Sequence, residues 1–147
     1  MQDLWNFALE LYARPGVEQA CLQVQDAGGD VCLLLTGAWL QRRGVLSEEN
    51  RLRELRDLAE PWQQEVVMPL RHLRQHWRSA AQQDADWAAL REQLKKLELQ
   101  AERVLLERLQ ALAESWPDGE AEDDWLSALA GQESAALQVL RGASRGL

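Results

Sequence analysis

The chain has 147 residues, of which 46% are hydrophobic and 27% charged, and its formal net charge is −8 at pH 7. A chain of this size and composition folds as one globular domain and needs neither disulfides nor metals to do so. The negative charge disfavours non-specific binding to nucleic acids and to anionic membranes. The start of the sequence has no basic segment and no cleavage site of a secretory signal, so we expect a cytoplasmic protein that binds neither nucleic acid nor membrane.

Proline and glycine divide residues 1–44 into short segments, which we expect to be buried helices. The most apolar of them is "DVCLLLTGAWL", residues 30–40. As a helix it rises about 15 Å, half of a bilayer core of about 30 Å, so it is too short to span a membrane. A buried strand is the alternative, but no other segment has a strand pattern to pair with it. We therefore predict that residues 30–43 form the central core helix, with Asp30 as its N-cap.

Residues 47–116 predict a long antiparallel helical hairpin. Apolar residues keep helical spacing from 47 to 80 through Pro61 and Pro69, which indicates a long helix kinked or broken near one or both prolines rather than a loop. Residues 84–116 keep a heptad spacing over about 50 Å, so this helix is expected to pair with 47–80. An acidic loop and short C-terminal helices fill 117–147. The predicted fold is all-α, a single-domain compact bundle of about five to seven helices.

Four motifs in the first half of the chain, "LYARPGV", "CLQVQDAGGDVCLLL", "WLQRRG" and "MPLRHLR", resemble a known family. It is an uncharacterised proteobacterial family catalogued as domain of unknown function 2390 (DUF2390), and the resemblance covers roughly residues 4–78. The family pattern has Asn where this chain has Cys32, and one more residue between Asp26 and Asp30. The resemblance implies an all-helical cytoplasmic protein and no particular activity.

The residues that most often carry metals or catalysis have no recognisable arrangement here. Cys21 and Cys32 fit neither a disulfide framework nor a CxxC site, and we expect two buried free thiols. His72 and His76 are four residues apart and could share a metal on a helix, but arginines surround them and repel cations. We therefore expect no metal, no cofactor and no catalytic residue.

A basic stripe is the first candidate binding site. Arg71, Arg74 and Arg78 share one helix face within residues 66–83, a stretch that contains no acid. The stripe predicts a site for an anion or an acidic partner. The alternatives are a solvated helix face and an internal match to the acidic residues of 114–124.

Two further candidate sites are a polar pair and an apolar pocket. Asp26 and Asp30 flank the Gly28–Gly29 turn and are a possible polar site, although a turn residue and a helix cap explain them as well. Large aromatic side chains suggest an apolar pocket among Trp5, Trp39, Trp62 and Trp77.

The sequence favours a non-enzymatic helical adaptor or regulator. Its partner would be another protein, for example an acidic one, or a second copy bound through the 84–116 helix. One alternative is a helical protein that binds an apolar small molecule. Another is an enzyme of unrecognised type that acts on an anionic substrate through Asp26, Asp30 and the arginine stripe. An adaptor predicts an exposed apolar surface, and a small-molecule binder predicts an enclosed cavity. An enzyme predicts a polar cleft with carboxylates whose pKa values are shifted.

Overall fold

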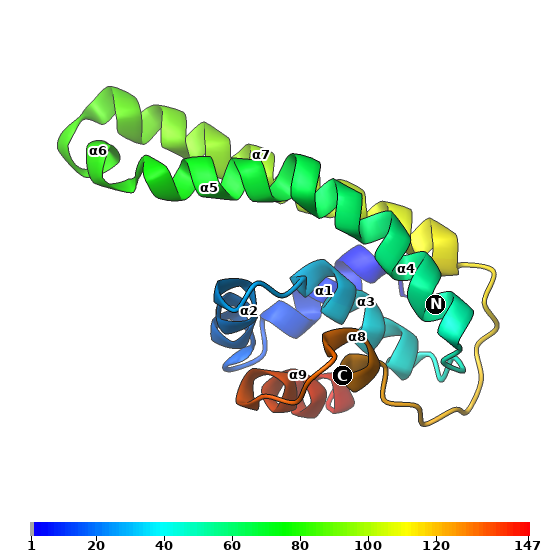
Figure 1. Ribbon diagram of the computed structural model, residues 1–147. Helices are drawn as coiled ribbons and strands as arrows, with labels where there is room; N and C mark the ends of the chain where they lie inside the picture. The colour runs from blue at the N-terminus through cyan, green and yellow to red at the C-terminus, as the bar shows by residue number, and fades with distance from the viewer. Residues whose placement is uncertain (1) are drawn as a thin grey trace.

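The computed structural model describes residues 2–147 and confirms an all-helical protein, since these residues form no strand. Figure 1 shows a compact body and a long hairpin that projects beyond it. The body contains α1 (Leu4–Tyr12), α2 (Val17–Asp26), α3 (Val31–Arg42), α8 (Trp125–Ala130) and α9 (Ala135–Arg145). The first arm of the hairpin contains α4 (Glu49–Trp62), the π-helix η1 (Gln63–Val67), α5 (Met68–His76) and α6 (Arg78–Gln83), and the return arm is α7 (Ala85–Ala113).

The apolar stretch forms α3 at the centre of the body, as predicted. Every residue from Val31 to Leu40 is buried, and Asp30 caps the helix by accepting a hydrogen bond from the Leu33 backbone N–H at 3.1 Å. Helix α3 contacts α1, α2, α8 and α9 and both arms of the hairpin. A Cβ atom at Gly37 would lie 2.8 Å from Leu129 Cδ1, so the glycine lets α8 pack closely across α3.

The first arm is divided more than the sequence predicts, and this raises the number of helices above the expected five to seven. Pro61 lies in the last turn of α4, and Pro69 lies in the first turn of α5. The wider π-helical turn η1 separates them. Because Pro61 has no N–H to donate, a local change of hydrogen-bonding pattern is expected beside it. The predicted kink is therefore realised as a π-helix, and the two arms still pair along α7.

The acidic loop, residues 117–124, is attached to the end of α3. The Gly119 and Ala121 backbone N–H groups donate to the carbonyl oxygens of Arg43 and Gly44, both at 3.1 Å. Gly44 has a φ of +67°, and a Cβ there would overlap the backbone of Gly119. The Arg43 guanidinium also pairs with Asp118. The loop is thus held at the body, far along the hairpin from α6 (Figure 1).

We expect Leu34→Ala to lower the free energy of unfolding by about 2–5 kcal/mol, because Leu34 is 4% exposed in the central helix and truncation leaves a cavity. Leu9→Ala is the matched control, since Leu9 is 51% exposed on α1 and its truncation should change stability by less than about 1 kcal/mol. Urea denaturation measures both. Equal losses in the two variants would contradict the assignment of α3 as the core.

Candidate functional site

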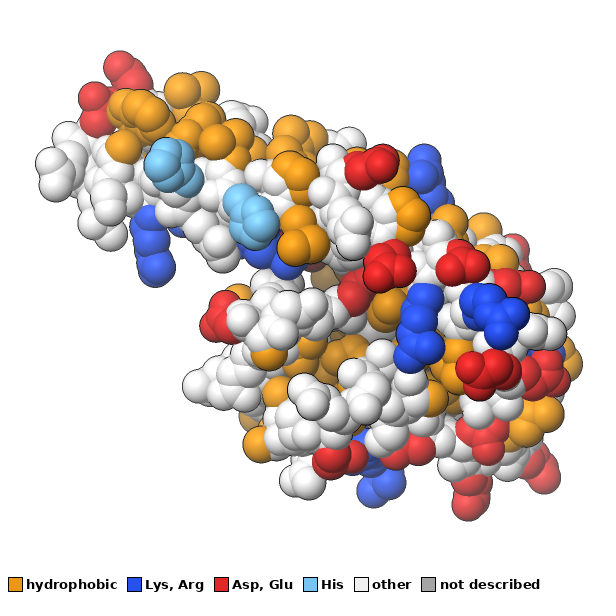
Figure 2. Space-filling view, in the orientation of Figure 1, with side chains coloured by type: hydrophobic (Ala, Val, Ile, Leu, Met, Phe, Trp, Pro, Cys, Tyr) orange, Lys and Arg blue, Asp and Glu red, His pale blue; other side chains and the backbone are white. Residues whose placement is uncertain are grey.

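The outer side of the distal hairpin carries an unusually exposed set of large apolar residues. Leu90 and Leu97 of α7 are 58% and 49% exposed, and Leu73 of α5 is 40% exposed. Residues at seven-residue spacing share one side of a helix, so Leu90 and Leu97 form a row. Figure 2 shows hydrophobic side chains gathered along the outer edge of the hairpin. We call this surface the hairpin apolar face and define it as Leu70, Leu73, Trp77, Trp87, Leu90 and Leu97.

The two arms are joined by a partly buried network of charges. Glu98 of α7 is buried and accepts from Arg71 Nε at 3.1 Å and from Arg74 Nε at 2.6 Å. Arg71 Nη2 also reaches Glu102 at 3.4 Å, and Arg91 Nε donates to the Arg74 carbonyl oxygen at 2.8 Å. Burial raises the pKa of Glu102, and the Arg71 charge opposes that rise. These contacts hold α5 and α7 in one register.

The network corrects the expectation of an open basic stripe. Arg71 and Arg74 are bound to carboxylates of the return arm. Of the three arginines of the stripe, Arg78 alone is exposed, and it makes no ion pair with the described residues. Their partner is Glu98 rather than the acidic loop of 114–124. The absence of acids near the stripe in sequence was misleading, because the antiparallel pairing of the arms brings Glu98 opposite it.

A cleft of about 530 Å³ lies between the Gly28–Gly29 turn and the first arm of the hairpin. We call it the polar cleft because most of its lining residues carry charged or amide side chains, although Leu33 and Met68 add apolar surface. Its wall includes Asp30, whose Oδ1 accepts from the Gln63 side-chain amide at 2.9 Å in addition to the cap bond. Gln63 lies in the π-helix and is buried. Burial raises the pKa of Asp30, although its hydrogen bonds and the charge of Arg71 act in the opposite direction. Asp30 therefore links the body to the hairpin.

The structure separates the two aspartates that the sequence suggested as a polar pair. Asp26 ends α2 and is exposed, and it does not line the cleft that Asp30 borders. Asp30 acts as a helix cap, which is the alternative interpretation that the sequence offered for this residue.

The four candidate tryptophans do not form one pocket. Trp39 lies in the buried helix of the body, whereas Trp77 packs edge-on against Trp87 near the tip of the hairpin, with ring centroids 5.4 Å apart. The Trp62 indole N–H donates to the Ala101 carbonyl oxygen at 2.9 Å. The guanidinium carbon of Arg103 lies over the Trp5 ring, 4.7 Å from its centroid. Trp5, Trp62 and Trp77 thus each contact a different part of α7, and Trp39 lies apart from them in the body.

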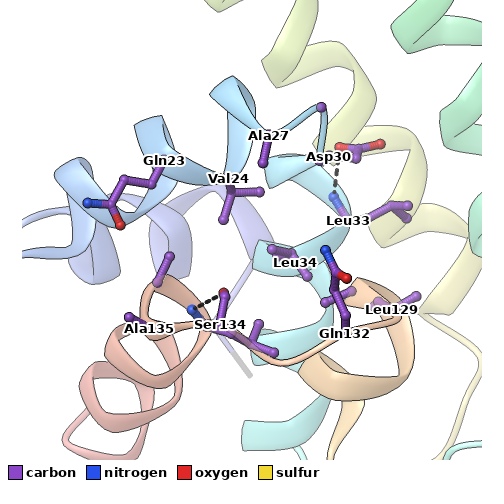
Figure 3. Close-up of a pocket in the computed structure, with 15 residues that line it drawn as sticks. Gln23, Val24, Ala27, Asp30, Leu33, Leu34, Leu129, Gln132, Ser134 and Ala135 are labelled. Carbon is purple, nitrogen blue, oxygen red and sulfur yellow. Dashed lines mark hydrogen bonds between the residues drawn. The ribbon is translucent and has the colours of Figure 1, made fainter.

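An apolar pocket exists elsewhere, between α2, the start of α3 and the α8–α9 connection (Figure 3). Its volume is about 370 Å³. Leu34 and Leu129 contribute apolar surface, and Gln23, Gln132 and Ser134 contribute polar groups. The pocket shares the Gly28–Gly29 turn and Asp30 with the polar cleft. Sequence reasoning missed it because its walls come from segments about 100 residues apart in the chain.

Groups that could carry metal or thiol chemistry are dispersed or buried. Across residues 2–147 no three His, Cys, Asp or Glu side chains are placed to hold one metal ion. His72 and His76 are exposed on α5. Cys21 and Cys32 are free and buried, and burial raises the pKa of both thiols. None of the helices in this part of the chain is long and apolar enough to cross a membrane.

Comparison with family models identifies a family. A family model described as "Protein of unknown function (DUF2390)" matches residues 3–109. These residues include the hairpin apolar face, the Glu98 network and Asp30, whereas α8 and α9 lie beyond them. Searches of curated proteins and of solved structures find no significant match.

Replacing Glu98 with alanine leaves two partly buried guanidinium groups without their shared carboxylate, so we expect a loss of stability of about 3 kcal/mol. Glu92→Ala is the control, because the Glu92–Lys95 ion pair is exposed and its removal should produce no measurable change. Chemical denaturation of both variants provides the comparison. If Glu98→Ala were as stable as Glu92→Ala, the network would not hold the arms together.

We expect Asp30→Asn to change the pH dependence of stability. The pKa of Asp30 is raised in the folded state, so the folded protein binds this proton more tightly than the unfolded chain. Asp30 therefore favours folding below its ordinary pKa of 3.8, and this contribution falls as pH rises through the folded value. Asparagine also caps helices but does not titrate.

The difference in unfolding free energy, wild type minus Asp30→Asn, should accordingly decrease between about pH 3 and pH 7. Urea denaturation at a series of pH values measures this difference. An increase over that range would mean that the charge of Arg71 outweighs burial at Asp30.

Proposed function

The chain belongs to the DUF2390 family of proteins of unknown function, and from the geometry of its hairpin we propose that it is a non-enzymatic helical interaction protein. In this proposal the hairpin apolar face is the docking surface. The observation that carries it is the exposure of Leu73, Leu90 and Leu97 on the two arms of a hairpin that projects beyond the body.

The physical argument starts from the unfavourable contact of these side chains with water. Covering apolar surface gains about 25 cal/mol per Å², and contiguous exposed patches on proteins mark interaction sites. The opposite side of the arms is fixed by the ion pairs of Glu98, so the apolar face is presented on a braced support. A preformed surface of this kind loses little entropy when a partner binds.

The polar cleft supports an enzymatic function less well. Among its lining residues, Asp30 is held as a helix cap, and Arg71 is already paired with Glu98 and Glu102. An anionic substrate in this cleft would meet the carboxylates of Asp30 and Glu60 as well as the guanidinium groups of Arg56 and Arg71. The electrostatic gain from binding such a substrate would therefore be small.

The pocket of Figure 3 supports a second candidate function, the binding of a small apolar molecule. Its volume of about 370 Å³ lies within the range of natural ligand pockets. Leu34 and Leu129 provide the apolar surface, and Gln132 could hydrogen-bond a polar group of the ligand.

The proposal predicts that the double variant Leu90→Glu, Leu97→Glu keeps its fold but loses its partner. Each variant, fused to the same tag, is used to capture proteins from a bacterial extract. Mass spectrometry identifies the captured species, and binding is then measured with the purified partner. We expect at least about tenfold weaker binding, which corresponds to about 1.4 kcal/mol.

Leu9→Glu is the control variant, because Leu9 is similarly exposed but lies on α1. It should bind like the wild type. Circular dichroism and thermal melting verify that both variants are folded. Undiminished binding by the double variant would show that the partner docks elsewhere.

A further inference from the structure

The distal hairpin has the construction of one layer of a four-helix bundle. Leu94 of α7 is only 7% exposed between the arms, whereas Leu90 and Leu97, which flank it, are about half exposed. Helix bundles bury such flanking rows beneath a second pair of helices. The side with the ion pairs of Glu98 also carries the exposed Leu99, but the row of exposed apolar residues lies on the other side, where a second layer would cover it.

The spacing of the row suits an antiparallel copy of itself. In a two-fold interface the same patch is contributed by both subunits, so it must be complementary to itself. Leu90 and Leu97 are seven residues apart, a rise of about 10 Å along the helix. An antiparallel two-fold axis midway between them places Leu90 of each copy opposite Leu97 of the other.

The charges beside the row favour the same arrangement. Along the edge of α7 the neighbours of the row include the uncharged residues Ala89, Gln93 and Gln100. The charged neighbours Asp86 and Lys96 have opposite signs and lie ten residues apart. Pairing about that axis places Asp86 of each copy about five residues, a rise of about 7.5 Å, from Lys96 of the other, and the same rise separates the two Lys96 side chains, so two attractive pairs outweigh one repulsive pair. The chain as a whole carries a net charge of −8, so copies that meet through their acidic surfaces repel one another.

The amount of apolar surface is suitable for a modest dimer. The four most exposed residues of the face have relative exposures of 40–58%. Together they present on the order of 400 Å² of apolar surface to solvent. A standard interface buries roughly 800 Å² per partner, and more than half of that is apolar. The face thus supplies most of the apolar part of one such interface, and the polar edges supply the remainder.

We propose that the occupant of the hairpin apolar face is a second copy of this chain, joined by an antiparallel two-fold contact of the two hairpins. This inference rests on the proposed function, because it names the partner of the same docking surface. The dimer buries Leu90 and Leu97 of both copies and leaves the body, the polar cleft and the pocket of Figure 3 uncovered.

Sedimentation velocity of the full chain between about 1 and 200 µM tests the inference. The molecular mass measured for the wild type and for Leu9→Glu should be twice the chain mass of 16.7 kDa. Leu90→Glu, Leu97→Glu should sediment at the mass of one chain while retaining its helical circular dichroism. A wild type that remains monomeric at 200 µM, or a folded double variant that remains dimeric, would overturn the proposal.

Cysteine cross-linking examines the arrangement independently. Gln93→Cys places a thiol near the proposed axis, so oxidation should link two copies covalently. Gln138 on α9 is also exposed but lies far from the hairpin apolar face. Gln138→Cys should therefore give no cross-linked product. Equal cross-linking of the two variants would overturn the antiparallel hairpin contact.

The outcomes separate this inference from the proposed function. Suppose that the wild type is monomeric but captures another protein, and that Leu90→Glu, Leu97→Glu abolishes this capture. The docking surface would then stand, and a second copy as its occupant would be overturned. A monomeric wild type with undiminished capture by the double variant would overturn both.

Discussion

The shared carboxylate of Glu98 is the interaction on which the hairpin depends. It holds Arg71 and Arg74 from the opposite arm, and it fixes how far α5 is displaced along α7. The register decides which residues lie between the arms and which lie outside them. With this register Leu94 is enclosed and Leu90 is left uncovered. A polar contact on one side of the hairpin thus determines the apolar character of the other side.

The attachment of the hairpin to the body depends on the π-helix. The wider turn of η1 directs Gln63 toward the cap of α3, where its amide meets Asp30. Cys32 approaches the Glu102 carbonyl oxygen of the return arm, and the Leu4 backbone N–H donates to Gln110. Both arms are therefore anchored at their body ends, and only the part beyond these contacts projects freely.

Sequence periodicity was sufficient to predict the helices. A helix that buries one side must repeat apolar residues every three to four positions, and this repeat is visible in the sequence. The uninterrupted apolar run predicted α3, and the heptad spacing predicted α7 and its pairing with the first arm. The candidate sites were harder, because each depends on segments far apart in the chain. Neither the pairing of Arg74 with Glu98 nor the pocket of Figure 3 has a local signal. Pro61 indicated a disturbance but not that it would become a π-helix.

The central position of α3 has a consequence for the biosynthesis of the chain. Two of its neighbours, α8 and α9, follow the hairpin in the chain, so part of its apolar surface has no cover until they have been synthesised. Nascent chains would expose Leu34 and its neighbours while the hairpin is already complete. The body can close only after α9 has left the ribosome, and a chain truncated after α7 would present this surface to chaperones and proteases.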